Sequence, residues 1–194
     1  MNRIINVSLL VLVMMGISCC PSVFGASNNQ CADVYSTAVR PNQLEVYFPS
    51  LGQDPAPVMV TLIDNTKDKI DMAVYQLTDP DIIAALDKAE GRGVQVRIIL
   101  DRNQLQGKYN TAAIAILRAD GISIRINSHP GQMNLKMTIF DSKIITTGSW
   151  DYTLQASETD DNNFVICSES QFIKICSDEF NRMWGSGQFI DLGS

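Results

Sequence analysis

The sequence has little positive charge and almost no histidine. Its 194 residues include 15 lysines and arginines against 21 aspartates and glutamates, and His129 is the single histidine. A protein that binds nucleic acid nonspecifically gains affinity when its Lys and Arg side chains release counterions. The formal net charge of −6 therefore argues against a long nucleic acid as partner unless basic groups gather at one site. Aromatic and basic residues are not interleaved in the sequence. The pattern that would indicate stacking of single-stranded bases is therefore missing.

Long apolar runs are absent except near the N-terminus. Residues 4–17 are apolar at all but three positions, follow Arg3, and precede small residues around Gly25. This pattern is typical of a secretory signal peptide, and the run is shorter than the roughly 20 residues that span a membrane. We expect a signal peptide at 1–25, export to the periplasm or medium, and a flexible arm at 26–43. An uncleaved anchor and a lipoprotein signal are the alternatives.

Cysteine is scarce in the chain that would remain after cleavage. Three cysteines are left, Cys31, Cys167 and Cys176. In an oxidising compartment we expect one disulfide and one leftover thiol, and the spacing does not select the pair. Alternatively, Cys176 is a small buried residue that shares a helical face with Phe172 and Phe180.

Strands alternate with helices through the rest of the sequence. The periodicity of apolar residues and the turn residues between them predict these elements. The expected strands are 44–48, 69–77, 94–100, 122–126, 135–140, 143–147 and 163–167. The expected helices are 58–64, 80–91, 110–119 and 170–183. This order predicts an α/β fold, with a mixed β-sheet and helices on both faces, in one domain over 44–194.

One motif stands out between Asn134 and Asp151. Its pattern is N-x-K-x4-D-x6-G-S-x-D. It resembles the signature of the phospholipase D superfamily, H-x-K-x4-D-x6-G-S-x-N. The sequence carries one copy and no internal repeat, so it is similar to the short, single-motif members, which include bacterial endonucleases and cardiolipin hydrolases. The resemblance runs from about residue 45 to residue 184.

The resemblance implies a metal-independent phosphodiesterase without a cofactor. In the family a neutral imidazole attacks phosphorus and forms a covalent intermediate, and a second imidazole protonates the leaving alcohol. Short members pair as homodimers so that two half-sites meet. The substrate is a nucleic acid or a phospholipid, and a phospholipid would entail peripheral membrane contact. The residues alone do not choose between these substrates.

Each position of the motif carries an expected role by this resemblance. Lys136 and Ser149 match the residues that bind the substrate phosphate, and Asp151 occupies a third phosphate-binding position. Gly148 allows the close backbone approach that phosphate binding needs. Asn134 stands where the family has its nucleophilic histidine.

Two of these positions depart from the family in ways that oppose catalysis. An amide has no basic lone pair at neutral pH, so Asn134 cannot replace an imidazole. Asp151 replaces a hydrogen-bond donor by an anion. Two like charges about 4 Å apart repel by about 4 kcal/mol at an effective dielectric near 20. A phosphate would therefore be opposed unless Asp151 is protonated or paired with Lys136.

Three further residues have roles that the sequence leaves open. Asp141 matches the family aspartate, but it is equally suited to the turn of an Asp-Ser hairpin. Asn162 stands where relatives have a glutamate that orients the histidine, and Glu158 or Asp161 could serve instead. His129 lies in a loop five residues before Asn134 and is a candidate for a rescue of catalysis.

The pattern of losses favours an exported phosphodiesterase scaffold whose activity is lost or impaired. The alternatives are an active enzyme with a non-standard site and a non-catalytic binding or regulatory homodimer. An asparagine introduced to trap a substrate would explain Asn134 but not Asp151 and Asn162. Trp150 and Tyr152 flank Asp151 and either line a groove or pack beside the site.

Overall fold

The computed structural model describes residues 42–119 and 121–192. The expected signal peptide, the expected arm apart from its last two residues, and Cys31 lie outside the described residues. Within them, no helix has both the length and the apolar composition needed to cross a membrane.

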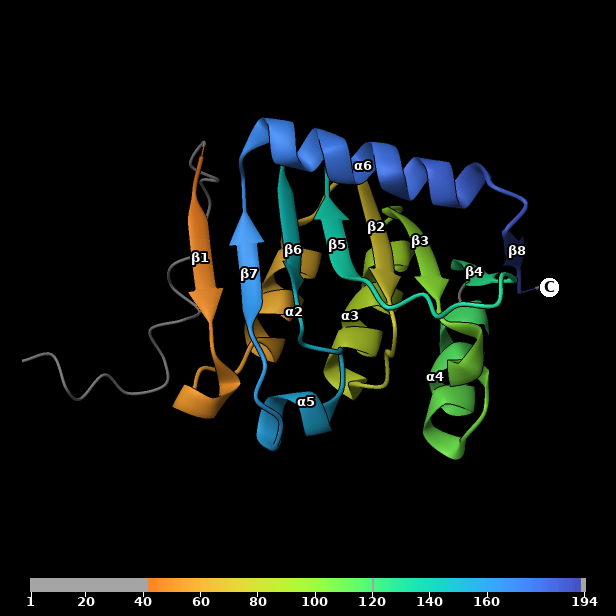
Figure 1. Ribbon diagram of the computed structural model, residues 1–194, viewed down its shortest axis with the longest axis horizontal. Helices are drawn as coiled ribbons and strands as arrows, with labels where there is room; N and C mark the ends of the chain where they lie inside the picture. The colour runs from red at the N-terminus through yellow and green to blue at the C-terminus, as the bar shows by residue number, and fades with distance from the viewer. Residues whose placement is uncertain (1–41, 120, 193–194) are drawn as a thin grey trace, which may run out of the picture.

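The described chain forms one sheet of eight strands with helices on both faces, as the sequence predicts (Figure 1). The strands are β1 (Leu44–Tyr47), β2 (Lys69–Val74), β3 (Gln95–Leu100), β4 (Ser123–Asn127), β5 (Lys136–Phe140), β6 (Ile144–Gly148), β7 (Phe164–Cys167) and β8 (Phe189–Asp191). The helices are η1 (Pro49–Leu51), α2 (Ala56–Asn65), α3 (Pro80–Gly91), η2 (Arg102–Leu105), α4 (Lys108–Ala119), α5 (Leu154–Glu158) and α6 (Ser170–Gly185).

The strand order across the sheet is β1-β7-β6-β5-β2-β3-β4-β8. β2 pairs in parallel with β3, and β3 with β4, whereas every other neighbouring pair is antiparallel. The sheet is therefore mixed. β2 and β3 end at the edge of the sheet where β5 begins, which is the lower edge in Figure 1.

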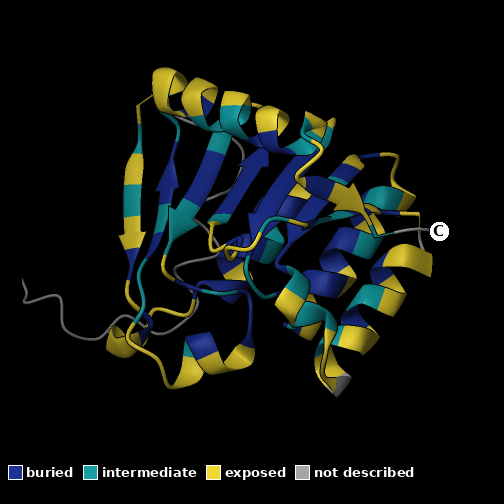
Figure 2. Ribbon diagram, turned by 45° about the vertical axis from the view of Figure 1, so that its right-hand side comes forward, coloured by how far each residue is buried: buried dark blue, intermediate teal, exposed yellow. Residues whose placement is uncertain are grey.

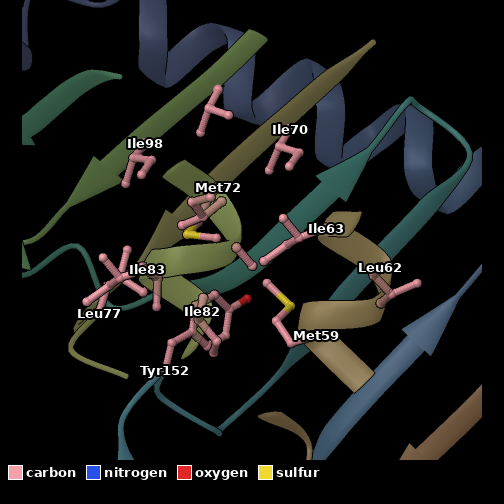
Figure 3. Packing of buried hydrophobic residues seen from close by; sticks show 14 of the residues in the cluster. Met59, Leu62, Ile63, Ile70, Met72, Leu77, Ile82, Ile83, Ile98 and Tyr152 are labelled. Atoms are coloured by element: carbon pink, nitrogen blue, oxygen red, sulfur yellow. The ribbon is translucent and has the colours of Figure 1, made fainter. Parts of the chain in front are cut away.

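Two apolar cores cover the two faces of the sheet. On one face α2, α3 and α4 pack against the central strands; Met59 and Ile63 of α2 and Ile82 of α3 lie against Met72 of β2 (Figure 3). On the other face α6 lies across the strands, and its Phe180 is fully buried. The central strands are buried from both sides (Figure 2), which fixes the strand ends that carry the motif.

Local signals in the sequence correctly place most helix ends. The side chain of Asp79 accepts hydrogen bonds from the backbone N–H groups of Asp81 and Ile82, so it caps α3 as predicted. The strand predicted at 69–77 ends at Val74, and α6 continues to Gly185 rather than ending at 183. These shifts of a few residues leave the element order unchanged.

Four short elements were not predicted: the helices η1, η2 and α5 and the strand β8. β8 has three residues and exists because it pairs with β4, where Phe189 lies opposite Asn127. α5 has five residues and is capped by Thr153, whose side chain accepts a hydrogen bond from the N–H of Ala156. Both are too short to produce a periodic pattern.

Two apolar residues do not lie as the sequence predicts. Leu135 precedes β5 rather than belonging to it, and it is 39% exposed. On α6, Phe172 is 37% exposed, and Ile173 takes its place in the core. Cys176 is half-buried against that core, and both it and Cys167 are free thiols, so the described residues contain no disulfide.

Candidate functional site

The start of the motif lies where β2 ends and β5 begins. Val74, the last residue of β2, pairs with Lys136, the first residue of β5. One residue further, the N–H of Tyr75 donates to the carbonyl of Leu135 at 2.9 Å. Central strands buried on both faces therefore hold the backbone around Lys136.

The ammonium group of Lys136 is enclosed by groups of the same chain. Its Nζ donates to Oδ1 of Asn134 at 2.5 Å and lies 3.5 Å from Oδ1 of Asp151. The ring of Tyr75 faces the ammonium at 5.0 Å from the ring centroid, a cation–π contact. Only 10% of the Lys136 side chain is exposed. Lys136 therefore contacts both Asn134 and Asp151, as well as Tyr75.

Asp151 is an acid in a poorly solvated position. Its side chain is 25% exposed, and its Oδ1 is buried without a hydrogen bond from the described residues. Burial raises the pKa of Asp151, although the nearby Lys136 ammonium lowers it. Asp160 adds a further upward contribution to this pKa through charge repulsion. The predicted pairing of Asp151 with Lys136 is present, as an ion pair without hydrogen-bond geometry.

Ser149 belongs to a second group of contacts with two asparagines. Its hydroxyl donates to Oδ1 of Asn162 at 2.8 Å and accepts from the backbone N–H of Asn163 at 3.1 Å. The N–H of Ser149 in turn donates to Oδ1 of Asn163 at 2.8 Å. Asn162 therefore positions the serine hydroxyl. Asn163 was not expected to matter, and its signal in the sequence was only its place beside Asn162.

Gly148 is required by this same group of contacts. Its φ is +140°, and a Cβ added there would lie 2.3 Å from the carbonyl oxygen of Asn163. The pairing of Thr138 with Thr146 brings Gly148 level with Lys136 across the β5–β6 hairpin. The glycine thus allows the chain before Asn163 to approach the start of β5. We refer to Asn134, Lys136, Ser149 and Asp151 together as the β5 site.

Asp141 lies outside the β5 site, in the hairpin turn at the opposite end of β5. Five residues separate it from Lys136, or about 17 Å of extended strand. Its carboxylate accepts hydrogen bonds from the backbone N–H groups of Lys67, Asp68 and Lys69. Burial alone would raise the pKa of Asp141, but these three N–H groups outweigh it and hold the pKa below its usual value. The structure thus favours the turn residue over the family aspartate.

His129 and the alternative orienting acids are not gathered at the β5 site. The imidazole of His129 packs edge-on against the ring of Phe189, with 5.5 Å between centroids. Phe189 belongs to β8, four strands from β5 in the sheet, or about 19 Å away. Glu158 and Asp161 are both exposed. The geometry therefore offers no replacement for the missing imidazole in the described part of the chain.

Trp150 and Tyr152 pack beneath the site rather than lining a groove. Each is 1% exposed, and their rings lie 5.0 Å apart. The hydroxyl of Tyr152 shares a 2.7 Å hydrogen bond with the hydroxyl of Thr138, two residues beyond Lys136. Burial raises the pKa of Tyr152 to about 12, so this hydroxyl stays neutral. These residues fix the floor of the site.

The β5 site offers one cation, one hydroxyl, one amide and one carboxylate. An ammonium and a hydroxyl are groups that bind a phosphate oxygen, whereas the carboxylate repels it. Among residues 42–119 and 121–192, no three His, Cys, Asp or Glu side chains lie close enough to hold a metal ion. An ammonium and a hydroxyl can bind a phosphate, and none of the four residues of the β5 site carries an imidazole.

Residues 59–184 match the family described as "Cardiolipin synthase, PLD-like domain". The chain belongs to this family of phospholipase D-like domains. Among curated proteins, it is 30% identical over 115 residues to the mitochondrial cardiolipin hydrolase of Homo sapiens, which covers 59% of this chain and 45% of the hydrolase. It is 34% identical over 109 residues to a phospholipase D of Rickettsia conorii, covering 56% and 54% of the two chains. The chain thus spans about half the length of these relatives.

Solved structures support the same placement. A phospholipase D family member, Nuc from Salmonella typhimurium, superposes with a TM-score of 0.72 and 27% identity, covering 79% of this chain and 99% of Nuc. NucT from Helicobacter pylori gives a TM-score of 0.69 at 18% identity and covers 78% and 99%; this second likeness shows the fold alone. The α/β fold and the phosphodiesterase scaffold expected from the motif are both confirmed.

Proposed function

We propose that this phospholipase D-like chain binds phosphodiesters at the β5 site and that its hydrolytic activity is lost or impaired. The single observation that carries the proposal is the contact of the Asn134 amide with Lys136, at 2.5 Å. The amide stands where the family places its nucleophile and is turned toward the lysine as an acceptor. On this proposal the chain keeps the lysine that binds the phosphate and has lost the histidine that attacks phosphorus.

The chemical reason for the lost activity is specific. Hydrolysis in two steps needs a group that attacks phosphorus and later releases it to water. The amide of Asn134 has no basic lone pair for that attack. Removing one member of a catalytic unit commonly lowers the rate by about 10⁴ to 10⁶. We therefore expect the native chain to turn over phosphodiesters at or below the limit of detection.

Among phosphodiesters, the proposal favours phospholipids over nucleic acid. The curated relatives are named for cardiolipin and phospholipids. The net charge of −6 also disfavours a polyanionic partner. A phospholipid ligand would bring the chain to the surface of a membrane, as a peripheral contact.

Export and pairing belong to the same proposal. The apolar run at 4–17 supports a cleaved signal peptide, which N-terminal sequencing of the exported protein would test. The resemblance to short family members supports a homodimer in which two β5 sites meet. Light scattering on the purified protein would give its mass, and a monomer at micromolar concentration would contradict that part.

Turnover tests the central part of the proposal. Bis-p-nitrophenyl phosphate and a phospholipid vesicle would be offered to the native chain and to an Asn134→His, Asp151→Asn double variant. We expect a silent native chain and a double variant at least about 10²-fold above background, because the variant regains an imidazole and loses the opposing charge. Native turnover that Lys136→Ala abolishes would contradict the proposal and call for another nucleophile.

A further inference from the structure

Both groups of the β5 site that can hold a phosphate already have partners within the chain. Lys136 donates to Asn134 and pairs with Asp151. The hydroxyl of Ser149 donates to Asn162 and accepts from the N–H of Asn163. A phosphate must therefore displace internal partners, and for Lys136 one of these is a charged carboxylate.

The carboxylate of Asp151 decides how much that displacement costs. Lys136 and Asp151 together carry no net charge, so an arriving phosphodiester anion leaves one negative charge unbalanced. That charge would sit on a side chain with 25% exposure and no hydrogen bond to its Oδ1. A poorly solvated carboxylate without a cation is unfavourable, and proton uptake is the usual relief.

We propose that Asp151 gates the β5 site, so that a phosphodiester binds to Lys136 when Asp151 takes up a proton. The inference rests on the proposed phosphodiester binding and adds its regulation. The proton comes from solvent and stays on the carboxyl group, which becomes neutral and is then able to donate a hydrogen bond to a phosphate oxygen. Lys136 keeps its charge and exchanges the carboxylate for the phosphate. Binding is thus stronger in acid than at neutral pH.

The groups around Asp151 support its assignment as the titrating residue. From β5 it faces Lys136, and from the chain after α5 the exposed carboxylate of Asp160 contributes to its electrostatics. Tyr75, at the end of β2, contacts Lys136 through its ring. Burial raises the pKa of Asp151, whereas the Lys136 ammonium and the backbone N–H of Gln76 lower it.

Binding of a small diester at several pH values tests the gate. Diethyl phosphate is a suitable probe because its charge remains −1 between pH 5 and pH 8. Its dissociation constant would be measured by phosphorus NMR or calorimetry for the native chain, Asp151→Asn and Asp160→Asn. The last variant is the matched control, since it removes a nearby carboxylate that is outside the site. Circular dichroism would verify that each variant is folded.

We expect the native chain to bind at least tenfold more tightly at pH 5 than at pH 8. Asp160→Asn should keep a pH dependence, with its midpoint moved to lower pH, because it removes a carboxylate that raises the pKa of Asp151. Asp151→Asn should bind at pH 8 as tightly as the native chain at pH 5, with less than a twofold change over the range. Native binding that is strong and independent of pH overturns the gate and leaves the proposed function intact. Failure of both the native chain and folded Asp151→Asn to bind, at any pH, overturns the gate together with phosphodiester binding.

Discussion

The two ends of strand β5 carry residues of one motif and use them for different purposes. At its start, the side chain of Lys136 faces Asn134 and Asp151, and its hydrogen bonds to described residues go to Asn134, two positions away. At its end, Asp141 accepts three backbone N–H groups from the chain that enters β2. The start is a site for a ligand, whereas the end fastens the β5–β6 hairpin to its neighbour.

The difference teaches that motif spacing does not separate chemistry from folding. The carboxylate of Asp141 accepts three backbone N–H groups, and as an anion with acceptors alone it has no donor for a phosphate. A lysine whose partners are an amide and a loose ion pair can exchange them. Substitutions at the two ends should therefore change different measurements, and the predictions below test this from the largest effect to the smallest.

Gly148→Ala should have the largest effect, because it adds a side chain where the backbones of Gly148 and Asn163 approach each other closely. The new Cβ would lie 2.3 Å from the carbonyl of Asn163, in a backbone with φ of +140°. Clash and strain together should lower the free energy of unfolding by about 3 kcal/mol. Urea denaturation measures this, and Gly185→Ala is a matched control, since a Cβ there meets no atom within 4 Å. Equal stability of the two variants would contradict the geometry at Gly148.

Lys136→Met and Asp141→Asn should separate binding from stability. Lys136→Met removes the cation but keeps the apolar stem, so diethyl phosphate at pH 5 should bind at least tenfold more weakly, with stability within about 1 kcal/mol of native.

Asp141→Asn should leave binding unchanged and lower the free energy of unfolding by about 1–2 kcal/mol, a range reduced for partial exposure. Asparagine tolerates the positive φ of 50° at this position, so only the side chain is tested.

The pH dependence of stability sharpens the prediction for Asp141. Its folded-state pKa lies below the usual value, so the carboxylate adds stability above the ordinary pKa near 3.8. That stability is lost as the pH falls through the lowered folded-state pKa. Thermal unfolding of the native chain and Asp141→Asn should therefore differ at pH 7, and the difference should shrink as the pH falls below 3.8 through the lowered folded-state pKa. A constant difference in acid would mean that the hydrogen bonds of Asp141 do not depend on its charge.

His129→Ala should have the smallest effect. The ring of His129 packs edge-on against Phe189 on β8, so its removal should lower the free energy of unfolding by about 0.5–1 kcal/mol. This contact lies far from β5. Diethyl phosphate should bind as tightly as it does to the native chain. Any weakening beyond twofold would show that His129 reaches the β5 site after all.

Much of the fold follows from local patterns in the sequence. Asp79 and Pro80 predict the start of helix α3, and short apolar runs between turn residues predict the strands. The elements that local patterns miss are those made by tertiary contact. β8 forms because Phe189 can pair beside Asn127. Leu135 is 39% exposed although its carbonyl accepts a hydrogen bond from the N–H of Tyr75.

Some features of the β5 site also follow from local sequence patterns, whereas others depend on tertiary contacts. The spacing of the motif correctly brings Asn134, Lys136 and Asp151 into contact, since two of them alternate along an extended chain. It could not decide the role of Asp141, because that depends on whether another chain segment offers free N–H groups. Nor could it find Tyr75, which reaches Lys136 only because β2 and β5 are neighbours in the sheet.

The measurement that tests the account most directly is a search for a covalent intermediate at position 134. The Asn134→His, Asp151→Asn variant would be quenched in alkali during reaction with bis-p-nitrophenyl phosphate, digested and analysed by mass spectrometry. We predict a phosphoramidate on residue 134, in which an imidazole nitrogen is bonded to a phosphoryl group that keeps its second p-nitrophenyl ester. It forms as the imidazole displaces one p-nitrophenolate, and none should form on the native chain. Turnover with no adduct at position 134, or with an adduct on His129, would contradict the claim that Asn134 occupies the place of the lost nucleophile.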